Sequence, residues 1–149
     1  MEMAELTKEL IELGATAKNK EEAIRLVGNL LVESGAVNKD YIESMLEREK
    51  TVSTYMGNFI AIPHGTDSSK KDIYKTAISV ATFPDGIDFS ETSDENKVFV
   101  LFGIAGKGNE HLDLLSSIAI FCSEIENVQK LIEADTPEEV IELLKTANE

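Results

Sequence analysis

Met56-Gly57-Asn58-Phe59-Ile60-Ala61-Ile62-Pro63-His64-Gly65-Thr66 is the stretch around which the chain is organised. Its apolar run from Phe59 to Ile62 predicts a short strand, which should stop at Pro63 because proline donates no hydrogen bond within a sheet. His64 follows, beside a glycine that allows backbone conformations closed to larger residues. The pattern predicts an imidazole held out from a rigid scaffold, although a turn histidine without function would look the same.

The composition is that of an ordinary globular protein. The 149 residues are enough for one domain with its own core, and 42% are hydrophobic and 28% charged. The formal net charge of −14 should repel nucleic acid and anionic membrane surfaces, and it should steer a basic protein partner toward the chain. Taken alone, the charge is better explained by solubility than by a basic partner.

The sequence also bears on the compartment. A single cysteine, Cys122, excludes an internal disulfide and fits a reducing cytoplasm as a small core residue. The first five residues are acidic and lack the basic and apolar regions of a signal peptide. The longest apolar run, Val98 to Ala105, is too short to span a bilayer. We expect a soluble, cytoplasmic protein that does not insert into membranes.

Helix and strand signals are mixed along the chain, which predicts an α/β sandwich. Helical spacing of apolar residues, with capping signals, predicts helices that start after Asn19, Asn38, Gly106–Asn109 and Thr136, with a further helical segment around Val128, Leu131 and Ile132. Strands are expected at 59–62, 75–83 and 98–104, and the last of these should be buried on both faces. Thr7 to Leu13 fits either a helical turn or a short strand.

Several smaller features complete this outline. The residues 51–57 are expected to form a connection, Pro84-Asp85-Gly86 a turn, Ile87 and Phe89 a brief edge strand, and 90–96 an acidic surface loop. The third helix should bury one apolar face, made of Leu112, Leu115, Ile118, Ala119 and Cys122.

A second signal is Gly106-Lys107-Gly108-Asn109-Glu110-His111, again a strand, a glycine loop and a histidine. His111 falls in the first turn of a helix, where unpaired N–H groups and the positive end of the helix dipole bind phosphate readily. Both histidines of the protein therefore follow strands, where open sheets bind their ligands. His111 taken alone would more often be a half-exposed residue at a helix start.

These residues suit phosphoryl transfer. A neutral imidazole is a good nucleophile near pH 7, and Arg48, Thr66, His111 and the helix N-terminus could donate to phosphoryl oxygens. Arg48 could instead be a surface charge that complements the helix dipole. His64, His111 and Asp113 lack zinc-type spacing, and the sequence contains no Walker loop, dinucleotide fingerprint or nucleophile elbow.

Four motifs follow one another along the chain, and they are Arg48-Glu49-Lys50, Thr54-Tyr55-Met56-Gly57, Ile60-Ala61-Ile62-Pro63-His64-Gly65-Thr66 and Asn109-Glu110-His111-Leu112. Together they resemble the mannitol/fructose-type IIA proteins of the bacterial phosphoenolpyruvate-dependent sugar phosphotransferase system. The resemblance covers essentially the whole chain, so it predicts one IIA type-2 domain over residues 1–149. It implies a single mixed β-sheet flanked by helices on both faces, and no cofactor.

The same resemblance implies a role for each site residue. His64 would accept a phosphoryl group from the phosphocarrier HPr and give it to a cysteine on the IIB domain of a mannitol permease. His111 would be a second active-site histidine and Arg48 would help to hold the phosphoryl group, with Gly65 and Thr66 as phosphate-binding neighbours. No metal is implied.

The subfamily is left open at this point. The motifs look most like the mannitol branch, while the fructose branch and the nitrogen-regulatory branch share Pro63-His64-Gly65. The rival functions are therefore a fructose-type IIA and a regulatory IIA that signals through its phosphorylation state. No IIB or IIC segment follows, so we expect a free-standing IIA. Met56 and Phe59 are candidates for the rim that contacts a partner.

Overall fold

The structure, a computed structural model, describes residues 7–51, 53–66, 71–89, 97–107 and 110–146, without the side chains of His111 and Thr146. In chain order its elements are the 3-10 helix η1 Lys8–Leu10, β1 Ile11–Glu12, α1 Lys20–Glu33, α2 Asp40–Thr51, β2 Tyr55–Gly57, β3 Ile60–Ala61, β4 Ala77–Asp88, β5 Lys97–Ala105, α3 Glu110–Cys122, α4 Ile125–Glu133 and α5 Pro137–Thr146. The expected 90–96 loop lies outside the described residues.

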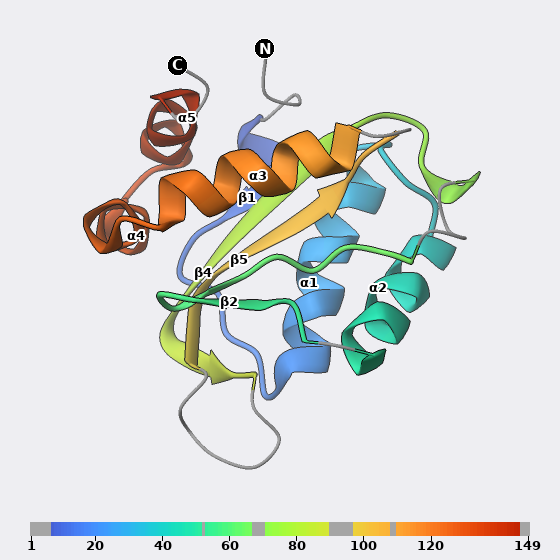
Figure 1. Cartoon of the computed structure of the whole chain (residues 1–149), viewed down its shortest axis with the longest axis horizontal. Helices are drawn as coiled ribbons and strands as arrows, with labels where there is room; N and C mark the ends of the chain where they lie inside the picture. Colours follow the sequence, from blue (N-terminus) through green and yellow to red (C-terminus); the bar gives the residue numbers. More distant parts are fainter. Residues whose placement is uncertain (1–6, 52, 67–70, 90–96, 108–109, 147–149) are drawn as a thin grey trace.

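The five strands form one mixed sheet in the order β1-β4-β5-β3-β2. The pairs β1–β4 and β3–β5 are parallel, whereas β4–β5 and β2–β3 are antiparallel. Helices α1 and α2 cover one face of this sheet, and α3, α4 and α5 lie on the other (Figure 1). The predicted α/β fold, a mixed sheet flanked by helices on both faces, is confirmed.

Each face of the sheet has its own hydrophobic core. The core beneath α1 and α2 contains Ala61 and Leu101, whereas the core beneath α3 to α5 contains Ile60 and Val100. This alternation follows from the strand period of two, which sends successive side chains to opposite faces. The central strand β5 is buried from Val100 to Ala105, as its uninterrupted apolar sequence predicts.

The first two helices begin at the predicted caps. The Asn19 side chain accepts a 2.9 Å hydrogen bond from the backbone N–H of Glu22, and Asn38 accepts one of the same length from the N–H of Asp40. Such caps satisfy backbone donors that have no partner within the helix. Gly35, with φ +83°, follows α1, as expected of a glycine stop.

The prediction of a connection at 51–57 was wrong in its last residues, because Tyr55 to Gly57 form β2. The strand predicted at 59–62 is also shorter, since only Ile60 and Ala61 are in β3. Asn58 and Phe59 have φ of +50° and +69° and form the two-residue turn between these antiparallel strands. Turns of this kind require positive φ at both positions. Glycine is the usual residue at the second position, so the sequence Asn58-Phe59 did not indicate a turn.

The turn predicted at Pro84-Asp85-Gly86 was also wrong. β4 runs unbroken from Ala77 to Asp88, and its pairing with β5 shifts between Thr82 and Ile87. The extra residues form a bulge, with Gly86 at φ +76°, so turn-forming residues mark an irregularity within one strand. The separate edge strand expected at Ile87 is therefore the end of β4.

The apolar face predicted for the third helix was rotated from the real one. Leu112 is 54% exposed, and the residues that α3 buries are Leu114, Ile118, Phe121 and Cys122. The helix is apolar around most of its circumference, so spacing alone did not fix the buried side.

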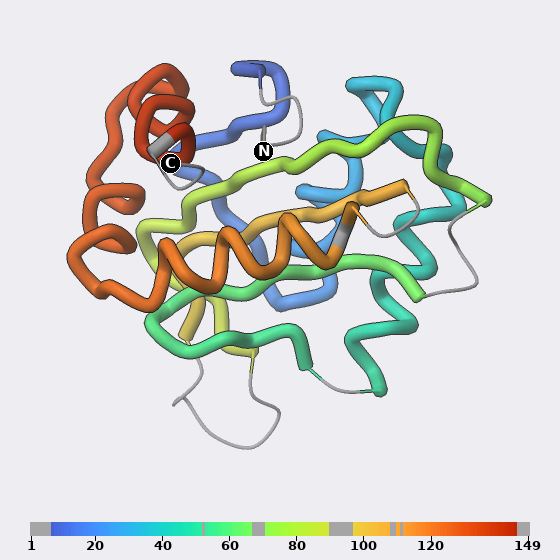
Figure 2. Tube along the Cα trace, turned by 45° about the horizontal axis from the view of Figure 1, so that its top comes forward, coloured from blue at the N-terminus to red at the C-terminus, as the bar shows by residue number. Residues whose placement is uncertain are grey.

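The two ends of the described chain lie together. The 7–13 segment, which fitted either a helical turn or a strand, contains both, η1 followed by β1. This segment lies against the C-terminal helix α5 (Figure 2). Thr136 accepts a 3.3 Å hydrogen bond from the N–H of Glu139 and so caps α5 as predicted. Within the described residues, no helix is long and apolar enough to cross a membrane.

Candidate functional site

The parallel strands β3 and β5 end at the same edge of the sheet. Ile60 pairs with Val100, and four residues further along both chains His64 pairs with Ile104 through an isolated bridge. The N–H of Ile104 donates to the carbonyl of Pro63 over 2.9 Å. The chain thus keeps its register after β3 ends, and His64 falls on the sheet face that Ile60 and α3 share.

One ring nitrogen of His64 is fixed by the backbone. Its Nδ1 lies 2.8 Å from the carbonyl oxygen of Ile62, and the residue is partly exposed. A carbonyl can only accept, so Nδ1 carries the hydrogen of this bond. In the neutral ring the lone pair is then on Nε2. In that tautomer Nε2 is the ring atom that could act as a nucleophile.

Helix α2 holds the two residues that follow His64. The hydroxyl of Tyr41 accepts a 2.9 Å hydrogen bond from the N–H of Gly65, and the hydroxyl of Ser44 accepts one of 2.8 Å from the N–H of Thr66. The Ser44 and Thr66 hydroxyls are themselves 3.0 Å apart and hydrogen-bonded. The predicted phosphate-binding role of Gly65 and Thr66 stays a prediction, and their N–H groups are directed at α2.

Arg48 lies on the same stripe of α2. Residues three and four apart are neighbours on a helix surface, so Tyr41, Ser44 and Arg48 follow one another along α2 toward its C-terminal end. Arg48 is half-buried. Next to it, the buried carboxylate of Glu49 accepts hydrogen bonds from both the N–H and the hydroxyl of Thr54, at 3.0 and 2.6 Å. These bonds tie the end of α2 to the chain that leads into β2.

The backbone position of His111 follows from the start of α3. His111 is the second residue of α3, which begins after the short connection from the end of β5. The connection is anchored at two points, because the Thr76 hydroxyl donates to the carboxylate of Glu110 over 2.5 Å and accepts from the N–H of Lys107 over 3.0 Å. The first turn of α3 and the His64 segment therefore share the edge where β3 and β5 end.

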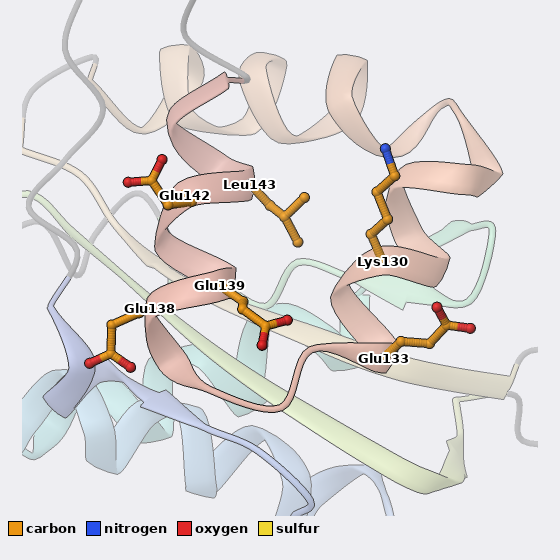
Figure 3. A pocket seen from close by; sticks show the side chains of 6 residues that line it. All are labelled: Lys130, Glu133, Glu138, Glu139, Glu142 and Leu143. Carbon is orange, nitrogen blue, oxygen red and sulfur yellow. The ribbon is translucent and has the colours of Figure 1, made fainter.

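We also considered a metal site and a surface hollow away from His64. The described residues contain no group of three or more side chains that could hold a metal ion. A hollow of about 670 Å³ lies between α4 and α5 (Figure 3). It is lined by Lys130, Glu133, Glu138, Glu139, Glu142 and Leu143. Its four carboxylates would repel a phosphoryl group, so the edge at His64 is the better candidate.

The sequence did not predict that the hydroxyls of Tyr41 and Ser44 bind the backbone after His64. Tyr41 looks like an ordinary core residue of an amphipathic helix, and it is 3% exposed. Ser44 is also buried, and it lies between apolar residues on the packed face of α2. A serine on an otherwise apolar helix face was the available signal, because buried hydroxyls require a hydrogen-bond partner.

Comparison with known proteins gives one consistent result. Residues 5–147 match the family described as "Phosphoenolpyruvate-dependent sugar phosphotransferase system, EIIA 2". The chain is 53% identical to the mannitol-specific phosphotransferase enzyme IIA component of Geobacillus stearothermophilus, covering 99% of this chain and 100% of that protein. It is 50% identical to the component of the same name from Bacillus subtilis, covering 98% and 100%.

A solved structure is similar in fold. The enzyme IIAMTL in a complex with phosphorylated enzyme IIBMTL from Escherichia coli aligns with a TM-score of 0.88 and 36% identity. The alignment covers 94% of this chain and 96% of that one.

Proposed function

The chain belongs to the EIIA 2 family of the phosphoenolpyruvate-dependent sugar phosphotransferase system, and we propose that it is the IIA component of a mannitol transporter. Relatives that are 53% and 50% identical over nearly their whole length are mannitol-specific IIA components, which favours this function over a fructose-type or a regulatory IIA. In this proposal residues 1–149 act as one IIA domain, in the cytoplasm.

The reaction is the transfer of one phosphoryl group through His64. Nε2 of His64 attacks the phosphorus of the phosphohistidine on HPr, and a new N–P bond forms as the old one breaks. The bonding electron pair returns to the donor imidazole of HPr. Nδ1 of His64 keeps its hydrogen and its bond to the carbonyl of Ile62 throughout. The group then passes to the IIB domain by the same kind of displacement, which regenerates the neutral imidazole.

One observation supports this assignment most strongly. His64 lies at the shared end of two parallel strands, and its Nδ1 is hydrogen-bonded to the backbone, which leaves the lone pair of the neutral ring on Nε2. Binding that holds the reacting atoms in line supplies much of the acceleration in phosphoryl transfer, so a ring fixed on a sheet edge suits the reaction. Arg48 and His111 would complete the site as donors to the phosphoryl oxygens.

The partners are HPr and the IIB domain of a mannitol permease. The solved complex of a similar IIA protein with phosphorylated IIB supports the second of these. Met56 and Phe59 are 42% and 44% exposed, and they remain our candidates for the rim of the contact. The net charge of −14 should speed the encounter with a basic surface, and added salt should slow it.

A reconstituted transport assay tests the proposal. The purified protein, phosphoenolpyruvate, enzyme I and HPr are added to membranes that hold a mannitol permease without its own IIA, and separately to membranes that hold a fructose permease. We expect mannitol phosphorylation in the first and little fructose phosphorylation in the second. Fructose phosphorylation at a rate equal to or higher than that of mannitol would refute the mannitol assignment. Phosphorylation of His64 without phosphorylation of either sugar would favour the regulatory function.

A further inference from the structure

The hydroxyl of Tyr41 is inserted into the parallel ladder beside His64. In a parallel pair, the N–H of the residue after a bridge partner donates to the carbonyl of the opposite residue. At the bridge between His64 and Ile104, Gly65 would donate to Ile104. Instead the Gly65 N–H donates to the Tyr41 hydroxyl over 2.9 Å, and that hydroxyl donates to the Ile104 carbonyl over 2.7 Å.

This insertion fixes the distance between the His64 segment and β5. One hydroxyl group accepts from the Gly65 N–H and donates to the Ile104 carbonyl, so both backbone groups have a partner at the bridge between the two segments. The opposite end of the same peptide pair is closed by the direct bond from the Ile104 N–H to the Pro63 carbonyl. His64 therefore lies where the ladder changes from direct bonds to a bond relayed by a side chain.

Ser44 continues the same arrangement one turn further along α2. Its hydroxyl accepts from the N–H of Thr66 and shares a second hydrogen bond with the Thr66 hydroxyl. Tyr41 and Ser44 are 3% and 8% exposed, so neither residue can touch a docked partner protein directly. Both act on the chain that follows His64, and they do so from the helix that also carries Arg48.

We propose that Tyr41 and Ser44 are positioning residues, which set the orientation of His64 relative to Arg48 for phosphoryl transfer. They couple the two groups because α2 carries Arg48 at one point and holds the backbone on the far side of His64 at two others. Loss of the Tyr41 hydroxyl lets the Gly65 N–H and the Ile104 carbonyl approach each other, which moves the His64 ring relative to α2. The proposal rests on the proposed function, since it assigns residues to that reaction.

Two pairs of variants test the proposal. Tyr41→Phe and Ser44→Ala remove one hydroxyl each and keep the rest of the core. The matched controls are Tyr74→Phe, which alters an exposed tyrosine, and Ser79→Ala, which removes a fully buried hydroxyl that donates to the Val27 carbonyl at the α1 face of the sheet. Single-turnover transfer from phospho-HPr is measured for each protein, at a temperature where circular dichroism shows it folded.

We expect Tyr41→Phe and Ser44→Ala to slow transfer by about 10- to 100-fold, since small displacements far from the reacting atoms can cost that much. The two controls should stay within about twofold of the wild type. The ¹⁵N chemical shifts of the His64 ring, measured on the unphosphorylated protein, should move in both test variants and in neither control.

The other outcomes overturn the proposal. Wild-type rates in folded Tyr41→Phe and Ser44→Ala proteins would show that the hydroxyls support only the fold. Equal losses in Ser79→Ala would show the same, because that variant perturbs the core without touching the loop. A wild type that takes up no phosphate would refute the proposed function. The ring shifts test the positioning role separately, and unchanged His64 ¹⁵N shifts in Tyr41→Phe and Ser44→Ala would reject it.

Discussion

The Nδ1 atom of His64 lies 2.8 Å from the carbonyl oxygen of Ile62, two residues earlier in the chain. A neutral ring so held keeps a hydrogen on Nδ1 and its lone pair on Nε2. We therefore predict that the phosphorylated protein carries its phosphate on Nε2 of His64. Two-dimensional NMR of ¹⁵N-histidine protein after incubation with phosphoenolpyruvate, enzyme I and HPr distinguishes the two nitrogens.

The same incubation of two variants provides the control for the first prediction. His64→Ala should take up no acid-labile, base-stable phosphate, while His111→Ala should still be labelled at His64. A signal from phosphate on Nδ1 would mean that the bond to Ile62 breaks before the reaction. A full equivalent of phosphate on His64→Ala would move the phosphorylated residue elsewhere.

The second prediction concerns His111, at the first turn of α3. A residue there lies among backbone N–H groups that have no helical partner, where negative charge is stabilised. His111→Ala should slow transfer by about tenfold, and more for transfer onward to IIB than for uptake from HPr, since it removes one donor to the phosphoryl group. Rapid-quench measurements in both directions give the two rates.

Ser116→Ala, on an exposed position of the same helix, is the matched control for His111 and should transfer at the wild-type rate. If His111→Ala and Ser116→Ala behaved alike in both directions, His111 would be a bystander at the helix start.

The third prediction concerns Arg48. Guanidinium binds two phosphate oxygens in a planar fork, whereas an ammonium group acts as a point charge. Arg48→Lys should keep the fold and the net charge yet lower the transfer rate by about tenfold, and Arg48→Ala should lower it further, by about 100-fold. Lys50→Ala removes an exposed positive charge from the same last turn of α2 and tests the alternative, a charge that merely complements the helix dipole.

Identical transfer rates for Arg48→Ala, Lys50→Ala and the wild type would mean that Arg48 only complements the dipole of α2. A loss confined to Arg48→Ala, with full activity in Arg48→Lys, would mean that charge matters and the bidentate geometry does not.

The sequence predicted the caps, the two helices on the first face and the buried central strand, because each depends on residues close together in the chain. Asn19 and Asn38 cap locally, and the run around Val100 is apolar whichever strand pairs with it. The missed turn and the wrongly predicted turn have the opposite cause. Phe59 occupies a turn position that usually takes glycine, and Pro84 sits in a bulge that only the pairing with β5 holds in place.

The candidate site divides in the same way. His64 and His111 could be proposed from the sequence because each follows an apolar strand signal and has glycine nearby, Gly65 after His64 and Gly108 before His111. The ladder insertion could not, because it joins Tyr41 to Gly65 and Ile104, which are 24 and 63 residues away. Hydrogen bonds over such separations are set by how α2 packs on the sheet, and no local pattern encodes them.

The last prediction follows from the burial of Tyr41. Removal from water raises the pKa of its hydroxyl from 10.0 to about 12, although its bond from Gly65 acts in the opposite direction. Between pH 10 and 12 the unfolded chain loses this proton while the folded protein keeps it, so the unfolded state binds fewer protons and the free energy of unfolding falls as pH rises. The tyrosine alone should remove about 2 kcal/mol over this range.

Urea unfolding at pH 8 and pH 11 measures this effect by comparing the wild type with Tyr41→Phe. At pH 8 the variant should be less stable by about 1 kcal/mol or more, because the Gly65 N–H and the Ile104 carbonyl lose their shared partner. At pH 11 the gap should shrink, since phenylalanine has no proton to lose. Cys122, whose pKa burial raises to about 12, destabilises both proteins equally at high pH and cancels in the difference. A gap that stayed constant from pH 8 to pH 11 would mean that the Tyr41 hydroxyl ionises as readily in the folded protein as in the unfolded chain, and that it is not held in the buried bridge between Gly65 and Ile104.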